Sequence, residues 1–250
     1  LRRALDMQEF ELHFQPIIRM HDRRVVGAEA LLRWESPTMG VVSPERFIPL
    51  AEETGLIISI GRWVLQQACH AINRWNQEHG GRLCMAINVS PRQFRDPHFV
   101  ETIRSALAES GLDGELLELE ITERLILDNT IETAEVLREL DAMKVRLSVD
   151  DFGTGYSALG YLRNYPFDTL KIDKSFIHDM GTSTENAALV RAIIQMAHSL
   201  SLEVIAEGVE APEEYELLKQ ENCDFAQGFL FTPPLREESF VAWLNGAGER

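Results

Sequence analysis

The chain has too few cations and too few cysteines for several classes of protein. Its 24 lysines and arginines face 40 aspartates and glutamates, which gives a formal net charge of −16 over 250 residues. This balance argues against a protein that binds the phosphate backbone of nucleic acids through a basic face. The cysteines, Cys69, Cys84 and Cys223, are odd in number and widely spaced. They indicate a reducing compartment and give neither a disulfide framework nor a zinc-ligand pattern.

Long apolar runs and histidine pairs are also absent. No apolar run approaches the roughly 18 residues of a membrane-spanning helix, and the sequence shows no signal peptide. The 7 histidines show no spacing of paired metal ligands. We therefore expect a cytoplasmic domain, or the cytoplasmic part of a membrane-anchored sensor, that contacts neither a membrane nor a nucleic-acid polymer. Because the chain opens without methionine, we expect residues 1–9 to be a linker or helix end from a longer protein with regulatory domains, and residues 10–250 to form one domain.

Strand patterns alternate with helix patterns after an initial hairpin. Apolar alternation predicts strands at 10–19, 25–32, 83–89, 116–121, 145–149, 169–172 and 202–206, and a last one around Phe225. The turn centred on Asp22 is too short for a crossover helix, so the first two strands should pair antiparallel with Gln15 and Glu29 facing each other. This order predicts an α/β fold, a modified TIM-type (β/α)8 barrel with an antiparallel first strand.

The stretch at 147–159, LSVDDFGTGYSAL, places Asp150 and Asp151 side by side at the end of a predicted strand. Two adjacent like charges are unfavourable unless a cation neutralises them. One carboxylate can bridge two divalent ions while its neighbour binds one of them, which is the arrangement that cleaves a phosphodiester by in-line displacement. A solvated turn that contains two acids is the alternative.

Polar residues follow every predicted strand. They are, in order, Gln15, Glu29, Asn88, Glu120, Asp150 with Asp151, Lys171 with Asp173, Glu207 and Gln227. Active sites of barrels lie at the carboxyl ends of the strands, so these side chains should converge on one mouth. Carboxylate and amide oxygens suit Mg²⁺ or Mn²⁺ rather than zinc. Any one of these acids taken alone is more often a helix N-cap or a solvated loop charge, but a polar residue after every strand is much harder to explain by caps alone.

Ordered motifs along the chain carry a resemblance to a known family. They are Gln15-Pro16, GAEALLRW from Gly27, FIPLAEETG from Phe47, INVS from Ile87, LELEITE from Leu117, DDFGTGYSAL from Asp150, LKIDKSFI from Leu170, AEGVE from Ala206 and QGFLF from Gln227. This set spans roughly residues 10–235 and resembles the EAL domain family, named after the tripeptide at Glu29. The resemblance implies a phosphodiesterase that hydrolyses cyclic di-GMP to linear pGpG in a barrel whose first strand is antiparallel. It implies an active enzyme, because no catalytic position departs from the family pattern.

The resemblance also implies two Mg²⁺ or Mn²⁺ ions in each site. The metal ligands would be Glu29, Asn88, Glu120, Asp150, Asp151 and Glu207. The catalytic residues would be Glu29, Asp150, Lys171 and Glu207. Asp150 would bridge the two ions, and Glu207 would bind directly or through water. Lys171 would orient the attacking water or stabilise the transition state, and it would also balance the neighbouring acids.

Substrate contacts follow from the same resemblance. They would come from Gln15, Leu32, Arg33, Pro49, Asp173 and Gln227. Arg33, four residues after Glu29, would grip a substrate phosphate, and Asp173 would fix Lys171 or touch the guanine. Glu123 either holds the loop at 150–159 in place or is a surface charge.

Two other functions remain in competition with this one. A non-catalytic cyclic di-GMP receptor would bind the ligand without turnover. A barrel phosphodiesterase of another type, for example one acting on glycerophosphodiesters, would need histidine pairs that the sequence lacks. The DFG triplet at Asp151 invites a kinase interpretation, but the nucleotide loop and the catalytic-loop signature are missing. We also expect a homodimer coupled to the site through the helix after this loop, with the turn at 153–155 as a mobile hinge.

Overall fold

The computed structural model describes residues 1–247 apart from 127–130, 154–161, 179 and 182. The strands are β1 (Phe10–Arg19), β2 (Val25–Ser36), β3 (Gly40–Val42), β4 (Cys84–Val89), β5 (Leu117–Thr122), β6 (Arg146–Phe152), β7 (Thr169–Ile172), β8 (Glu203–Ala206), β9 (Phe225–Ala226) and β10 (Leu235–Arg236). The helices are α1 (Arg2–Asp6), α2 (Pro44–Thr54), α3 (Leu56–His79), α4 (Pro91–Phe94), α5 (Phe99–Ser110), the 3-10 turn η1 (Gly114–Leu116), α6 (Glu123–Ile126), α7 (Ile131–Ala142), α9 (Lys174–His178), α10 (Thr184–Ser199), α11 (Pro212–Gln220) and α12 (Glu237–Ala247).

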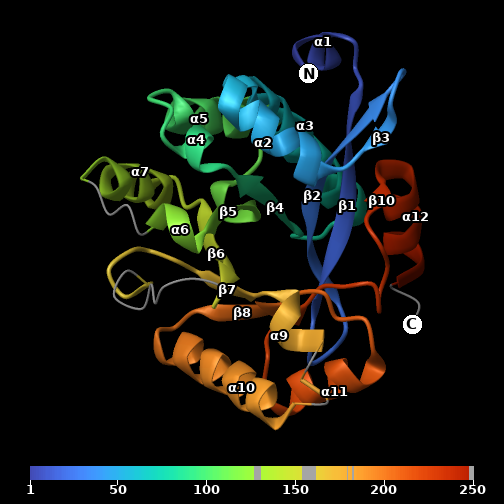
Figure 1. Cartoon of the computed structure of the whole chain (residues 1–250), viewed down its shortest axis with the longest axis vertical. Helices are drawn as coiled ribbons and strands as arrows, with labels where there is room; N and C mark the ends of the chain where they lie inside the picture. The colour runs from blue at the N-terminus through green and yellow to red at the C-terminus, as the bar shows by residue number, and fades with distance from the viewer. Residues whose placement is uncertain (127–130, 154–161, 179, 182, 248–250) are drawn as a thin grey trace.

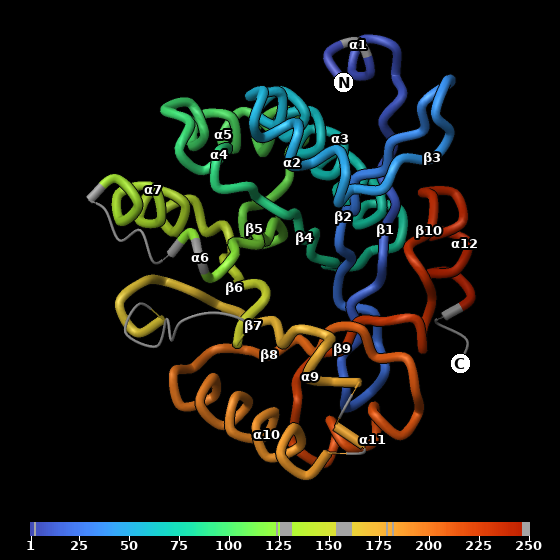
Figure 2. Tube along the Cα trace, in the orientation of Figure 1, coloured from blue at the N-terminus to red at the C-terminus, as the bar shows by residue number. Residues whose placement is uncertain are grey.

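The strands of the described chain close into a barrel. They pair in the order β1-β9-β8-β7-β6-β5-β4-β2, and β2 pairs again with β1, which completes the ring. All neighbours from β2 round to β9 run parallel, whereas β1 runs antiparallel to both β2 and β9. The predicted barrel with an antiparallel first strand is therefore confirmed. Helices surround it on the outside (Figure 1), and α12 returns beside β1 (Figure 2).

The β1–β2 hairpin matches the predicted pairing. Gln15 lies opposite Glu29 in the register of the two strands. The turn between them is held by the side chain of Asp22, which accepts a hydrogen bond of 3.2 Å from the backbone N–H of Arg24. β2 continues to Ser36, beyond the predicted end at 32, because its last residues pair with β3. This long hairpin brings a side chain of β1 to the same mouth as the parallel strands.

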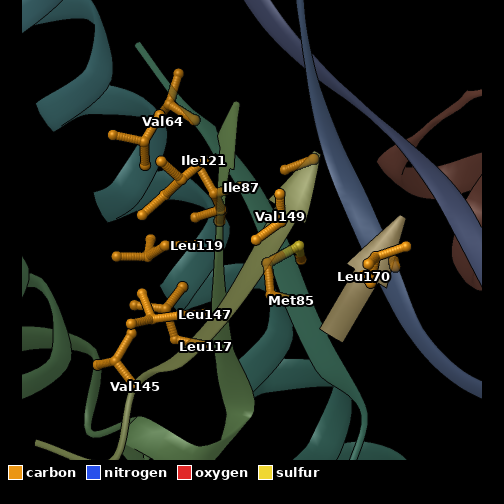
Figure 3. Close-up of a cluster of buried hydrophobic side chains, with 14 of the residues drawn as sticks. Val64, Met85, Ile87, Leu117, Leu119, Ile121, Val145, Leu147, Val149 and Leu170 are labelled. Carbon is orange, nitrogen blue, oxygen red and sulfur yellow. The ribbon is translucent and has the colours of Figure 1, made fainter. Parts of the chain in front are cut away.

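Alternate residues of the central strands face opposite sides of the barrel wall. The outward ones form an apolar cluster under the helices (Figure 3), and they include Met85, Ile87, Leu117, Leu119, Ile121, Leu147 and Val149. Because side chains alternate along a strand, the residues between them face the barrel interior. That set includes Asn88, Glu118, Glu120, Ser148 and Asp150. Folding of the outward cluster thus fixes which polar side chains point inward.

A small apolar cluster lies inside the barrel, deeper than the mouth residues Asn88 and Glu207. Ile17, Ala86 and Ile205 form this cluster, separate from the main core. At the start of β6, Arg146 donates hydrogen bonds of 3.1 Å to Glu118 and 2.6 Å to Glu203. The interior therefore has a polar mouth, a small apolar cluster on one side below it, and an ion-paired base.

Further predictions concern the N-terminal residues, the loop after β6 and membrane-spanning helices. Of the two alternatives for residues 1–9, a linker or a helix end, the structure has a short helix, α1. Ala4 in this helix belongs to the main core, and Trp34 donates to the carboxylate of Glu9 at 2.8 Å. The division between residues 1–9 and the domain at 10–250 stays a prediction. The predicted hinge at Thr154-Gly155, most of the predicted helix at 159–163 and the predicted dimer contact there lie outside the described residues. Of the helices that the structure describes, none has both the length and the apolar character needed to cross a bilayer.

Candidate active site

A single buried ammonium group lies among four carboxylates at the mouth of the barrel. The Lys171 side chain is 1% exposed, and its Nζ lies 2.6 Å from Glu120, 2.7 Å from Glu207, 3.7 Å from Glu29 and 3.8 Å from Asp150. Each acid comes from a different strand or strand end: β2, β5, β6 and the residue after β8. We call these four acids and Lys171 the acid cluster. The predicted convergence of strand-end residues is present in the structure.

Amide side chains extend the acid cluster on the side of Glu29. Asn88 donates to one oxygen of the Glu29 carboxylate at 2.6 Å, and Gln227 donates to the other at 2.6 Å. Gln227 also donates to Gln15 at 3.0 Å, and Gln15 donates to the backbone carbonyl of Thr232 at 3.2 Å. This chain of hydrogen bonds sets the orientation of Glu29 from strands on both sides of β2.

The acid cluster contains more acidic than basic groups, and the pKa values of its members are shifted as a result. Burial, with the nearby Glu29 charge, raises the pKa of Glu120 well above its usual value, although Lys171 opposes this. Burial also raises the pKa of Glu207 to about 7. Burial disfavours the ammonium of Lys171, but the surrounding acids outweigh it and raise its pKa well above the usual value. The site therefore holds one firmly protonated cation and acids that are short of positive charge.

Asp151 lies beside the acid cluster in an unusual backbone conformation. Its φ of 55° is in the left-handed region, and its backbone N–H donates to the Asp150 carboxylate at 2.9 Å. Burial and the charges of Asp150 and Asp173 raise the pKa of the Asp151 carboxyl. Gly153, two residues further on, has a φ of 97°, and a Cβ there would lie 3.0 Å from the ring of Phe176. The backbone thus turns sharply where the second predicted metal ligand stands, at a conformational cost that functional sites commonly carry.

The side chains of the acid cluster suit a hard divalent cation in their chemistry. Both carboxylate oxygens of Glu120 are buried and accept no hydrogen bond from the described residues, although one lies 2.6 Å from the ammonium of Lys171. Carboxylate and amide oxygens are the ligands that Mg²⁺ and Mn²⁺ prefer. Within the described part of the chain, however, no three acidic, histidine or cysteine side chains are grouped so as to hold a metal ion. In this structure Lys171 supplies the countercharge that a metal would otherwise provide.

The predicted substrate contacts lie in varied environments. Arg33 is on the same face of β2 as Glu29 and donates to the carbonyl of Leu32 at 2.9 Å. Burial lowers the pKa of its guanidinium, although the negative charge of Glu29 opposes this effect. Leu32 itself packs partly against the main core, and Pro49 is exposed within α2. Arg33 is therefore the one of these three whose side chain shares a face with the acid cluster.

Asp173 and Glu123 both lie at the start of a short helix, Asp173 just before α9 and Glu123 as the first residue of α6. Asp173 accepts hydrogen bonds from the backbone N–H and the hydroxyl of Ser175, and so caps the start of α9. Its predicted roles toward Lys171 or the guanine stay predictions. Glu123 is 3% exposed and opens α6, so the surface-charge interpretation is wrong. The loop that it was expected to hold extends into residues outside the described part.

Two polar groups near the acid cluster were not predicted. The carbonyl of Thr232 anchors Gln15, which only the fold reveals, because the two lie 217 residues apart. Ser148 lies on the inward face of β6, two residues before Asp150, and is fully buried. The alternation of that strand was the available signal, since every second residue counted back from Asp150 faces inward.

Comparison with known proteins supports the same family. The chain matches the EAL domain over residues 1–234. It is 43% identical over 244 residues to the signaling protein YkoW of Bacillus subtilis, covering 98% of this chain and 30% of YkoW. It is 43% identical over 235 residues to the cyclic di-GMP phosphodiesterase NbdA of Pseudomonas aeruginosa, covering 94% of this chain and 30% of NbdA. The chain thus spans less than a third of the length of either relative.

A solved structure agrees with the fold over nearly all of the chain. The PaMucR phosphodiesterase in complex with c-di-GMP superposes with a TM-score of 0.91 at 40% sequence identity, covering 96% of this chain and 97% of that chain. The family match includes β1 and the first nine residues, which agrees with the packing of Ala4 in the core. On its sequence and its fold, the chain belongs to the EAL domain family.

Proposed function

We propose that this domain is a divalent-metal-dependent phosphodiesterase that hydrolyses cyclic di-GMP to linear 5′-pGpG. NbdA is named a cyclic di-GMP phosphodiesterase, and PaMucR is a phosphodiesterase with c-di-GMP in its complex. The observation that carries the proposal is the acid cluster itself, in which four acids share one ammonium group and Oε2 of Glu120 is buried without a partner among the described residues. Acids held this close without enough positive charge are suited to binding cations.

The proposed metal ligands divide between two ions. Glu29, Asn88, Glu120 and Asp150 would hold one ion, Asp150 and Asp151 would hold the other, and Glu207 would bind directly or through water. When bound, two divalent ions activate a water for in-line attack on phosphorus and neutralise the phosphoryl oxygens. Asp150 would be the shared ligand, because it belongs to the acid cluster and its carboxylate also accepts the backbone N–H of Asp151.

The remaining polar groups act on the substrate and on protons. Lys171 stabilises charge that develops on the phosphoryl group, since its ammonium stays protonated at every working pH. Arg33 binds a substrate phosphate at the rim. Gln15 and Gln227 hold Glu29 in place and line the mouth. Hydrolysis breaks one of the two phosphodiester bonds of the ring, which leaves a 5′-phosphate and a free 3′-hydroxyl.

A binding-only receptor is the second candidate. The observation that favours it is the pairing of Lys171 with all four acids, without a metal-ready group of three among the described side chains. A receptor would bind cyclic di-GMP and return it unchanged.

One experiment separates the two candidates. Purified domain is incubated with cyclic di-GMP and either Mg²⁺, Mn²⁺ or EDTA, and the products are followed by chromatography. The proposal predicts metal-dependent pGpG, lost in Glu29→Ala and Asp150→Asn. Binding of cyclic di-GMP without any pGpG would instead establish the receptor.

The wider setting of the domain remains proposed. We propose a homodimer, as the sequence resemblance implies. We also propose fused regulatory domains in the full-length protein, because the relatives are more than three times as long as the matched region. A cytoplasmic location remains a prediction from the sequence.

A further inference from the structure

A buried serine on β6 has a hydroxyl group without a partner. Ser148 is 0% exposed, and its Oγ makes no hydrogen bond within the described residues. Buried polar groups are nearly always paired, so an unpaired hydroxyl inside a barrel needs an explanation. Its place in the register of the strands supplies one.

The neighbouring strand offers an acceptor that is also unpaired. Ser148 lies directly opposite Glu120 in the pairing of β5 and β6. Both side chains face the barrel interior. Glu120 Oε1 lies 2.6 Å from the ammonium of Lys171, whereas Oε2 is buried and has no partner among the described residues. Adjacent strands lie about 4.8 Å apart. A serine hydroxyl at that spacing reaches a facing carboxylate directly or through one buried water.

Other neighbours of Ser148 are less suitable partners. Thr169, its register partner on β7, already accepts a hydrogen bond of 3.2 Å from Arg146. Glu118 has one unpaired oxygen, but it lies opposite Arg146 at the ion-paired base, two residues deeper than Glu120. The register therefore favours Glu120 as the acceptor.

We propose that Ser148 is a positioning residue for Glu120, whose carboxylate its hydroxyl orients toward the metal. The inference rests on the proposed metal-dependent function, and it concerns a residue that contacts neither substrate nor metal. In the metal-free domain Lys171 holds Glu120, and the hydroxyl stays idle. With a metal bound at Glu120, the hydroxyl of Ser148 would hold the carboxylate in the orientation that the ion needs. Such outer contacts to metal ligands commonly change metal affinity by about 10- to 100-fold.

The test measures metal affinity and metal-free stability in the same variant. Mn²⁺ is titrated calorimetrically into the substrate-free domain, and melting is followed separately in EDTA. Ser148→Ala should raise the Kd for Mn²⁺ about tenfold, or about 1.4 kcal/mol. It should leave the melting temperature in EDTA unchanged or slightly higher, because it deletes a hydroxyl that has no partner there.

A second serine provides the matched control. Ser110 is also buried, but its hydroxyl donates to the carbonyl of Ala106 at 2.7 Å, at the end of α5. Ser110→Ala should lower the melting temperature in EDTA and leave the Mn²⁺ affinity unchanged.

The outcomes separate this inference from the function that it builds on. A Kd for Ser148→Ala within about twofold of wild type, or a drop in its EDTA melting temperature like that of Ser110→Ala, overturns the positioning role alone. Failure of the wild-type domain to bind Mn²⁺ overturns the proposed function, and the positioning role with it.

Discussion

Lys171→Met tests whether one ammonium group stabilises the acid cluster in the metal-free domain. The substitution keeps an unbranched side chain of similar length and removes the charge. Four carboxylates then share a buried space without a cation, where the nearest two had been 2.6 and 2.7 Å from Nζ. Removing one partner of a buried ion pair costs about 3–5 kcal/mol, because the other charge is left uncompensated.

The lower end of that range is expected for this site. Glu207 has a pKa of about 7, so it takes up a proton near neutral pH at little cost and relieves part of the repulsion. Glu120, whose pKa is also raised, does the same. A loss of about 3 kcal/mol corresponds to a fall in melting temperature of about 6–12 °C in a domain of this size.

Thermal melts in EDTA measure the effect, and an exposed lysine controls for the loss of charge. Lys144 makes an ion pair of 3.0 Å with Glu115, but its side chain is 73% exposed, so Lys144→Met should change the melting temperature little. Saturating Mn²⁺ should restore much of the stability of Lys171→Met, since the ion neutralises the same acids. Equal melting temperatures for the two variants in EDTA would show that Lys171 does not stabilise the acid cluster.

Three further results are expected. Glu29→Ala removes a proposed metal ligand and the acceptor of two amide side chains, so pGpG formation should fall by more than about 100-fold, and a smaller loss in a steady-state assay would contradict its role. In EDTA the free energy of unfolding, measured by urea melts, should decrease as pH rises from about 4.5 to 7. The reason is that folded Glu207, with its pKa of about 7, keeps a proton that the unfolded chain has released. With Mn²⁺ present, the free energy of unfolding should depend less steeply on pH. Gly228→Ala places a methyl group 2.1 Å from the carbonyl oxygen of Val209, so it should destabilise the domain by about 1–3 kcal/mol, whereas Gly181→Ala at an exposed turn should be nearly neutral.

Much of the barrel and most of the site could be predicted because they depend on short-range patterns. The strand at Thr169–Ile172 was predicted with its observed ends, and the hairpin register followed from the short turn. Strand-end positions such as Glu120 and Glu207 converge because the barrel closes, and closure follows from the order of strands and helices. The sequence alone thus places the ligands on one rim.

The sequence alone could not predict which side chains contact one another at the rim. Lys171 pairs most closely with Glu120 and Glu207, which depends on side-chain reach across the barrel rather than on spacing. Burial of Glu123 could not be distinguished from exposure, since a glutamate at the start of a helix is usual in both settings. Pairing of Gln15 with Thr232 joins the two ends of the chain, and no local signal marks it.

The small apolar cluster of Ile17, Ala86 and Ile205 has a consequence for the field at the mouth. Hydrocarbon side chains solvate charge poorly, so the neighbouring acids gain little stabilisation from this part of the barrel interior. Low-dielectric surfaces beside like charges focus their field toward the open side of a cleft. The negative potential of the acid cluster is therefore concentrated at the opening of the barrel, where it attracts cations.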